Sequence, residues 1–306
     1  MPLKPLKPYW QLYDLLYKNC SKKSLFKKLK KECKRLGKPY QKKDNRGRKP
    51  KFTPIVYTAF LCLQKIFRHR YREMELEATL YLPAKADHST FARNYNKIEE
   101  EYIERLITSL VDKEFIYWIA DSTAISTKIK VERTRQGLRK KELLTDKYHI
   151  ICGYDPPTHT TLIVGVKATD HHISDSGGAI MILKNKKSRA YFFGDSAYNT
   201  YALHELVKQT GLFPMIKPDN KGIKKTLSPK AKNVKLFSKN FYKNIRGVVE
   251  TIFGGATNAG LMLSYAKKQH TRRLDTLMLA LRHNLLAVMR LLYPLFCATN
   301  SFCSPN

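Results

Sequence analysis

Five short apolar runs of strand type constrain the fold of this chain more than any other feature of its sequence. They lie at residues 114–120, 148–154, 160–167, 190–194 and 212–216. Helical periodicity appears between and after them, at residues 174–183, 198–210, 240–254 and 272–293. Three strands, a helix, a fourth strand and further helices predict an α/β domain in which helices cover a mixed sheet.

Two of these strand-like runs end on an aspartate, Asp121 and Asp195. A third acid, Glu250, lies in a helical segment where Tyr242, Arg246 and Glu250 recur every four residues. On a helix this spacing places the three on one face, with about 40° of drift per step. Two strand ends and one helix face can bring three carboxylates together, which suits two divalent cations and phosphodiester chemistry. A plain Arg246–Glu250 ion pair remains the structural alternative.

The charge of the chain points to the polyanion that such a site would act on. Lys and Arg total 57 against 25 Asp and Glu, a formal net charge of +32. Neutralising phosphates releases counterions and supplies most non-specific affinity for DNA, so a nucleic acid is the expected partner. A hydrophobic fraction of 43% argues against a disordered basic tail. A ribosomal or chromatin-like protein would have no use for a carboxylate cluster.

Cysteine usage and hydropathy indicate the expected compartment. None of the six Cys forms a CxxC pair, which argues against a structural zinc site. The N-terminus has no apolar core of the signal-peptide kind. The apolar stretch from Leu274 to Phe296 is broken by Arg282, His283 and Arg290, and so predicts a buried amphipathic helix and no membrane span. We expect a cytoplasmic, nucleoid-associated protein.

Residues 1–112 predict an all-α, basic DNA-binding region ahead of a catalytic domain at 113–306. Thr53 is the expected N-cap of a helix that begins at Pro54. Two short helices within 71–97 suggest a helix-turn-helix whose second helix presents Arg93, although a plain helical subdomain is equally compatible. Arg46 and Arg48 lie in a basic hinge, and we expect all three arginines to contact DNA.

Further basic segments flank the acids. The stretch from Lys128 to Lys147 is expected to form a loop that either clamps DNA or lies free in solvent. A Lys-rich connector at 217–243 carries Lys239 and Lys243, which we expect to contact DNA beside Tyr242 and Arg246. Asp175, after His171 and His172, is expected at the capped start of a helix.

In the order of its elements and motifs, the chain resembles a DDE transposase of a prokaryotic insertion sequence, with an RNase H-like catalytic domain. The resemblance covers most of the sequence. The matching segments are Gly47-Arg-Lys-Pro-Lys-Phe-Thr-Pro54, Tyr71-Arg-Glu73, Asp87-His-Ser-Thr90, Asp121-Ser-Thr123, Gly194-Asp-Ser-Ala-Tyr198, and Tyr242, Arg246 and Glu250. A short Asp-Ser-Thr string is weak alone, but all of these segments in this order are specific.

The resemblance implies that Asp121, Asp195 and Glu250 hold two Mg²⁺ or Mn²⁺ ions, with Asp121 bridging both. It implies metal-dependent cleavage at element ends and strand transfer into target DNA, by a homodimer on double-stranded DNA. The chain departs from the family at Thr257, where a Lys or Arg is usual. Two alternatives remain: a transposase-derived DNA-binding protein without catalysis, and a structure-selective nuclease on the same fold.

Overall fold

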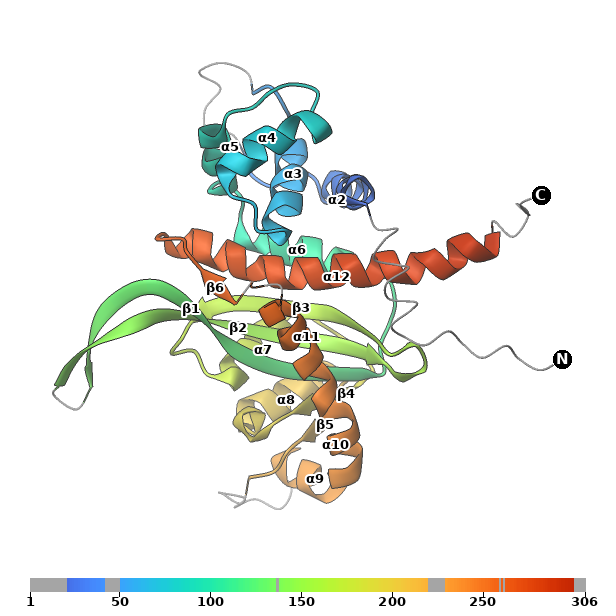
Figure 1. Cartoon of the computed structure of the whole chain (residues 1–306). Helices are drawn as coiled ribbons and strands as arrows, with labels where there is room; N and C mark the ends of the chain where they lie inside the picture. Colours follow the sequence, from blue (N-terminus) through green and yellow to red (C-terminus); the bar gives the residue numbers. More distant parts are fainter. Residues whose placement is uncertain are drawn as a thin grey trace. The chain divides into compact units, whose positions relative to one another are not determined.

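The structure is a computed structural model that describes residues 21–41, 50–135, 138–219, 229–258, 260 and 262–299, without the side chains of 128–129, 131–144, 263 and 290–299. The chain divides into two compact units (Figure 1). One comprises residues 1–98 with 284–306, and the other comprises residues 99–283. Each unit is described by itself below.

The first unit is helical, as the sequence predicts. Thr53 caps its second helix by accepting a hydrogen bond from the backbone N–H of Val56 at 3.4 Å, and Pro54 stands at the first helical position. A six-residue segment, 82–87, joins the last two helices, whereas three or four residues are usual in a helix-turn-helix. The helices are α2 (Lys22–Leu36), α3 (Pro54–Ile66), α4 (Tyr71–Tyr81) and α5 (His88–Tyr95).

The second unit is built on a mixed sheet with the strand order β3-β2-β1-β4-β5, which confirms the RNase H-like α/β fold. β1 pairs antiparallel with β2, and β2 with β3, whereas β1, β4 and β5 are parallel. A two-residue strand, β6, also pairs with β1. The strands are β1 (Tyr117–Arg135), β2 (Leu138–Asp155), β3 (Thr160–Asp170), β4 (Tyr191–Gly194), β5 (Phe213–Ile216) and β6 (Leu263–Ser264).

The first strand does not end at Asp121, contrary to the sequence prediction. β1 continues to Arg135 and pairs with β2 as far as Arg135↔Leu138, with one shift in register between Ser126 and Lys130. The segment from Lys128 to Lys147, expected as a loop, is therefore mostly two strand arms, which extend beyond the helices as a curved ribbon in Figure 1. No strand was predicted there, because charged residues dominate the segment and the apolar alternation of its first arm is limited to Ile129 and Val131.

Helices cover both faces of this sheet. α7 (Asp175–Leu183) contacts β2 and β3, and α10 (Lys239–Arg246) contacts β1 and β4. Gly178 lets α7 approach closely, because a Cβ there would lie 2.2 Å from the ring of His149 on β2. On the other face, the ring of Phe241 in α10 lies 5.6 Å from Tyr117 and 5.3 Å from Phe193. Because α7 and α10 cover opposite faces of the sheet, alternate residues of β1 face one helix or the other.

The remaining helices differ in detail from the predicted ones. The segment predicted as one helix at 240–254 is divided into α10, a 3₁₀ turn η3 (Gly247–Val249), and α11 (Glu250–Asn258). The segment predicted at 198–210 is a 3₁₀ turn η2 (Ser196–Tyr198) followed by α8 (Tyr201–Gln209). The other helices are α6 (Glu100–Ser109) and α12 (Gln269–Thr299), with a 3₁₀ turn η1 (Pro156–Thr158) between β2 and β3.

A buried ion pair anchors the start of α12 to the sheet. Arg272 Nε lies 2.7 Å from Asp146 Oδ2, and both side chains are almost inaccessible to solvent. Leu274, Leu277 and Leu281 are buried as well, in keeping with the predicted core helix. Among the residues described, no helix combines the length and the apolar character that are needed to span a bilayer.

Candidate active site

Asp121 lies on β1, and Asp195 follows directly after the neighbouring parallel strand β4. Ile119 of β1 is paired with Phe193 of β4, so each aspartate comes two residues after a paired residue and faces the same side of the sheet. Asp195 is the N-cap of η2, and its carboxylate accepts a hydrogen bond from the N–H of Ala197 at 2.8 Å. The sequence prediction that these two acids meet therefore agrees with the sheet geometry.

Arg246 is the cation that contacts Asp121 in the structure. Its Nη2 lies 2.9 Å from Asp121 Oδ1, and the two side chains are 15% and 16% exposed. Burial is the largest influence on the pKa of Asp121 and raises it, while Arg246 and the N–H of Ser122 oppose the rise and leave the pKa above its ordinary value. Among the described residues, Nε and Nη1 of Arg246 are buried without a hydrogen-bond partner. The guanidinium thus carries two buried N–H groups that can donate to a further anionic partner.

Glu250 is not in the same position relative to Arg246 as the sequence predicts. It is exposed at the start of α11, and no hydrogen bond or ion pair joins its carboxylate to another described residue. The 3₁₀ turn between α10 and α11 explains the difference. With three residues turning by about 120° each instead of 100°, Glu250 is rotated about 100° from Arg246 around the helix, and not about 40°. Arg246 pairs with Asp121, and the structural alternative of an Arg246–Glu250 ion pair is not found.

The other predicted DNA contacts on α10 lie around this arginine. Tyr242 is half-buried, and its ring centroid lies 5.3 Å from that of Phe237. Burial raises the pKa of Tyr242, so it stays a neutral hydrogen-bonding group. Lys239 and Lys243 are exposed and form no ion pair with any of the described residues. This end of α10 therefore presents free positive charge next to Asp121.

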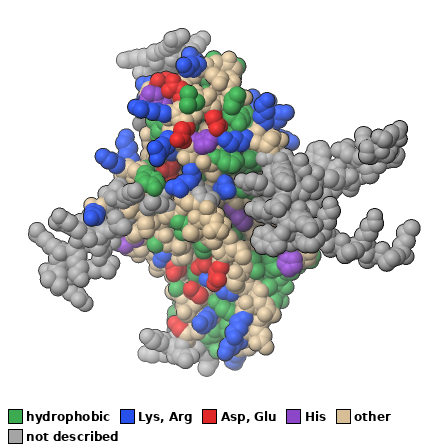
Figure 2. All heavy atoms as spheres, viewed as in Figure 1, with side chains coloured by type: hydrophobic (Ala, Val, Ile, Leu, Met, Phe, Trp, Pro, Cys, Tyr) green, Lys and Arg blue, Asp and Glu red, His purple; other side chains and the backbone are tan. Residues whose placement is uncertain are grey.

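Of the three arginines of the first unit that were predicted to contact DNA, the structure describes one. Arg93 is exposed on α5, and its Nη2 lies 3.3 Å from Ser89 Oγ. Arg46 and Arg48 lie outside the described residues. Figure 2 shows Lys and Arg side chains spread over the visible face, with acidic side chains in small groups among them. Thr257 of α11 is uncharged, and its hydroxyl donates a hydrogen bond to the carbonyl of Phe253 at 2.9 Å.

Four residues that sequence reasoning did not place in the site lie next to the two aspartates. Ser122 donates a hydrogen bond to Asp175, and Lys147 pairs with the same carboxylate. Tyr198 is buried, and burial, followed by the charges of Asp121, Asp175 and Asp195, raises its pKa. Ser122 and Tyr198 both stand in the short motifs that carry the aspartates, so the motifs themselves held a signal. Lys147 carried none, because it joins the site only through the pairing of β1 with β2.

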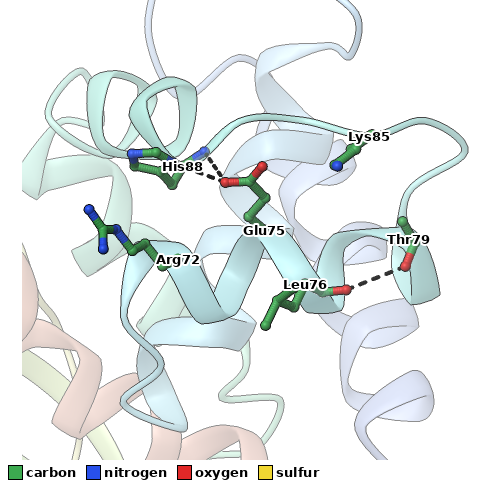
Figure 3. Close-up of a pocket in the computed structure, with 6 residues that line it drawn as sticks. All are labelled: Arg72, Glu75, Leu76, Thr79, Lys85 and His88. Carbon is green, nitrogen blue, oxygen red and sulfur yellow. Dashed lines mark hydrogen bonds and ion pairs between the residues drawn. The ribbon is translucent and has the colours of Figure 1, made fainter.

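A separate pocket of about 580 Å³ lies in the first unit (Figure 3). Glu75 and His88 line it, with His88 Nδ1 2.9 Å from Glu75 Oε2 and 3.5 Å from Asp87 Oδ2. These groups already serve the fold: Asp87 caps α5 by accepting from the N–H of Ser89 at 2.7 Å, and Glu75 also accepts from the N–H of His88. The three side chains therefore tie α4 to the start of α5.

The comparisons with known proteins concern the sheet unit above all. A family model described as a transposase DDE domain matches residues 119–285, more than half of the 306-residue chain, and this range includes Asp121, Asp195 and Glu250. No curated protein matches the chain. One similar solved structure is described as a cryo-EM structure of a piggyBac transposase synaptic complex with hairpin DNA. It has 8% identity and a TM-score of 0.42, over 98% of this chain and 78% of that chain.

Proposed function

The chain belongs to the family of transposase DDE domains, and from this membership we propose that it cleaves DNA at the ends of an insertion sequence and joins the freed 3′-hydroxyls to target DNA. The observation that carries the proposal is the register of β1 and β4, which brings the Asp121 and Asp195 carboxylates together beneath a basic helix. The source we propose is a prokaryotic element, and the place of action is the nucleoid.

We propose that Asp121, Asp195 and Glu250 hold two Mg²⁺ or Mn²⁺ ions. The donor set fits, because hard cations prefer carboxylate oxygens, and because the buried Asp121 already takes a cationic partner in Arg246. When bound, such ions stabilise developing charge and lower the pKa of water. Glu250 would have to turn toward the two aspartates, and the 3₁₀ turn before it is the place where α10 and α11 can rewind.

The residues of α10 are suited to hold and orient DNA. Arg246 has two N–H groups without a partner among the described residues, Nε and Nη1, and each can donate to a phosphate oxygen, while Tyr242 can donate to another. Lys239 and Lys243 add exposed charge for the backbone of element ends and target. Arg93, with Arg46 and Arg48, would extend these contacts from the first unit. We propose a homodimer on DNA, so that two element ends are held together.

A transposase-derived DNA-binding protein without catalysis is the second candidate. It is favoured by the exposed position of Glu250 and by Thr257 at the usual basic position. The intact carboxylates at all three positions favour the enzyme. The two candidates differ in one measurable property, which is cleavage that depends on a divalent cation.

The test uses a plasmid carrying the gene with its flanking DNA, with Mg²⁺ or Mn²⁺. We expect Asp121→Asn, Asp195→Asn and Glu250→Gln each to lower cleavage by on the order of 10²-fold or more, because each removes a carboxylate that would hold the cations that stabilise the transition state. DNA binding should stay within about twofold of the wild type. Asp155→Asn is the matched control, since Asp155 pairs with Lys113 at 2.7 Å at the far end of β2. Full cleavage by Asp195→Asn would refute the site.

A further inference from the structure

Asn199 closes the short turn that carries Asp195. The turn η2 has Asp195 as its N-cap and Asn199 as its C-cap. Its backbone is hydrogen-bonded at both ends, from the N–H of Tyr198 to the carbonyl of Asp195 at 3.1 Å and from the N–H of Asn199 to the carbonyl of Ser196 at 3.2 Å. The position of Asn199, which is 5% exposed, and the position of Asp195 are therefore linked through one hydrogen-bonded turn.

The amide of Asn199 is held from two sides. Its Nδ2 donates to Asp219 Oδ1 at 2.5 Å, and its Oδ1 lies 2.9 Å from Nε2 of His204. Because an ionised carboxylate can only accept, the amide nitrogen must face Asp219, and Nε2 of His204 must carry the proton. Burial lowers the pKa of His204 to about 4, so its ring is neutral at neutral pH. Asn199 thus links the turn to α8 and to the segment after β5.

The carboxylate of Asp219 is held in turn by a buried lysine. Lys230 Nζ lies 2.9 Å from Asp219 Oδ1, and the lysine side chain is 7% exposed. The hydrogen bond from Lys230 lowers the pKa of Asp219, so the carboxylate is ionised at neutral pH. Lys230 belongs to α9 (Pro229–Leu236), which forms within the Lys-rich connector. It is turned into the fold, unlike Lys232 and Lys235, which are exposed on the same helix.

A second side chain of α9 fixes the end of β5. Asn233, three residues after Lys230, is fully buried and bonds both backbone groups of Ile216. Its Nδ2 donates to the Ile216 carbonyl at 2.8 Å, and its Oδ1 accepts from the Ile216 N–H at 3.2 Å. Since β5 is the last strand in the sheet order, this amide takes the place of a neighbouring strand. α9 is therefore anchored to the sheet three residues before Asp219.

We propose that Asn199, Asp219 and Lys230 form a buried polar network that positions the Asp195 carboxylate for divalent cations. This inference rests on the proposed function, because it takes Asp195 as a ligand of those cations. Asn199 is a positioning residue, since it acts through the turn and touches neither a cation nor DNA. The network also gives Lys230 a role that differs from that of the exposed connector lysines, which are placed to meet phosphate.

The members of this network depend on one another. A buried polar group that loses its partner keeps its desolvation penalty without the compensating bond, and the cost is larger for a charged group. Removing either Asn199 or Lys230 therefore disturbs the same carboxylate, that of Asp219. The effects of the two removals on the Asp195 turn should for this reason not be additive.

The experiment removes each end of the network in the full chain and compares the result with a matched control. Asn199→Ala removes both side-chain bonds at the turn. Its control is Thr210→Val, which removes one buried hydrogen bond, to the carbonyl of Val207 at 2.8 Å, at the other end of α8. Lys230→Met removes the ammonium. Its control is Lys186→Met, because Lys186 is half-buried in the same unit and forms no ion pair with a described residue.

The first measurement is Mn²⁺ binding to the DNA-free protein, by titration calorimetry or electron paramagnetic resonance. We expect Asn199→Ala to weaken it about tenfold, the lower end of what loss of support behind a metal ligand costs. Lys230→Met should weaken it about fivefold, because Lys230 is one bond further from the turn. The double variant should stay within about twofold of Asn199→Ala alone, and both controls within about twofold of the wild type.

The second measurement is DNA affinity without a divalent cation. Lys230→Met should stay within about twofold of the wild type, because its ammonium is buried against Asp219 and adds little to phosphate contacts. Lys239→Met, at an exposed position of α10, should bind DNA more weakly. An equal loss of DNA affinity in both variants would assign Lys230 to DNA and overturn its place in the network.

The outcomes separate this inference from the proposed function. Asn199→Ala with the Mn²⁺ affinity of Thr210→Val would overturn the positioning role, even if the wild type cleaves DNA as proposed. Losses that multiply in the double variant would show two separate effects and would also overturn the network. A wild type that binds Mn²⁺ but cleaves no DNA, with weaker binding in Asn199→Ala, would support the positioning role and overturn the transposase. If circular dichroism shows that Asn199→Ala does not fold, Lys230→Met against Lys186→Met decides in its place.

Discussion

At the scale of single residues, Arg246 is the side chain whose placement changes the interpretation of the site most. Its sequence spacing from Glu250 suggests an ion pair along one helix face, yet its guanidinium lies on Asp121 at 2.9 Å. A divalent cation and the Arg246 guanidinium cannot both contact the same oxygen of the Asp121 carboxylate. If Asp121 holds a cation as proposed, the arginine would compete with that cation in the DNA-free state and would be released to phosphate when DNA enters.

This competition predicts opposite effects of one substitution on two properties. Arg246→Gln should tighten Mn²⁺ binding to the DNA-free protein by at least about fivefold, since a charge pair at about 4 Å contributes about 1 kcal/mol even in water. The same variant should cleave and join DNA less well. Arg246→Lys keeps the charge but loses the planar fork, so its metal affinity should change little while strand transfer weakens more than overall DNA binding.

Lys243→Gln is the matched control for these variants. It removes one positive charge from the same helix at an exposed position without an ion pair among the described residues. We expect little change in its Mn²⁺ affinity. If Arg246→Gln bound Mn²⁺ no more tightly than Lys243→Gln, or if it transferred strands at the wild-type rate, the competition between arginine and cation would be wrong.

At the scale of secondary-structure elements, the sequence predicts the sheet better than its periphery. The five core strands were predictable because their apolar runs are short, rich in β-branched and aromatic residues, and bounded by turns. The arms of the β1–β2 hairpin were not, because Lys and Arg dominate them and the apolar alternation at Ile129 and Val131 is too short to indicate a strand. Pairing between the two arms keeps this segment extended.

The candidate active site could also be predicted in part: the placement of its two aspartates, but not that of Glu250. Asp121 and Asp195 follow apolar runs that become neighbouring parallel strands, so their meeting is a consequence of topology. The position of Glu250 depends on whether one helix runs through Gly247, Val248 and Val249. Glycine and β-branched residues are weak helix formers, and three together allow the 3₁₀ turn that rotates Glu250 away from Arg246. The low helix propensity summed over these three residues is the sequence signal that would have indicated the break in the helix.

The close approach of α7 to β2 gives a prediction at this scale. Gly178→Ala should lower the free energy of unfolding by about 1–3 kcal/mol, because the new Cβ would lie 2.2 Å from the His149 ring and force side chains or backbone to move. Gly254→Ala in α11 is the control, since nothing lies within 4 Å of its added Cβ. Alanine there should raise stability by up to about 1 kcal/mol, as expected from helix propensity.

Urea unfolding followed by far-ultraviolet circular dichroism checks the pair. The two substitutions are chemically identical and both lie in helices, so a difference in sign can come only from the surroundings of each glycine. If Gly178→Ala were as stable as Gly254→Ala, α7 would not rest on His149 as described, and the support that this helix gives to Asp175 would have to be reconsidered.

At the scale of the whole molecule, the compact units divide the chain differently from its expected functional regions. The sequence suggests a change of character near residue 113, whereas the sheet unit begins at Glu99 and ends at His283. The helix α6 explains the shift, because it contacts β3 and its Glu104 pairs with Lys167 at 2.8 Å. The last part of α12 belongs to the first unit. Whether DNA recognition follows these structural limits remains a prediction.

Fragments cut at the two boundaries give the last prediction. A fragment of residues 99–283 should fold, whereas one of residues 112–283 should be insoluble or far less stable, because it lacks α6. That helix buries four large side chains, each contributing about 1.5–3 kcal/mol, and together they rival the whole stability of an ordinary domain. The four are Tyr102, Ile103, Leu106 and Ile107.

The folded 99–283 fragment should bind DNA weakly, with an affinity that falls steeply as salt rises, and should not distinguish the DNA flanking its gene from random duplex. This follows if Arg93 and the basic N-terminal segment supply most of the recognition, while α10 supplies only contacts to phosphate. Competition binding at two salt concentrations, with the full chain as reference, measures both properties. A 99–283 fragment that still selects the flanking sequence would place recognition in the sheet unit, and the assignment of residues 1–112 to end recognition would then fail.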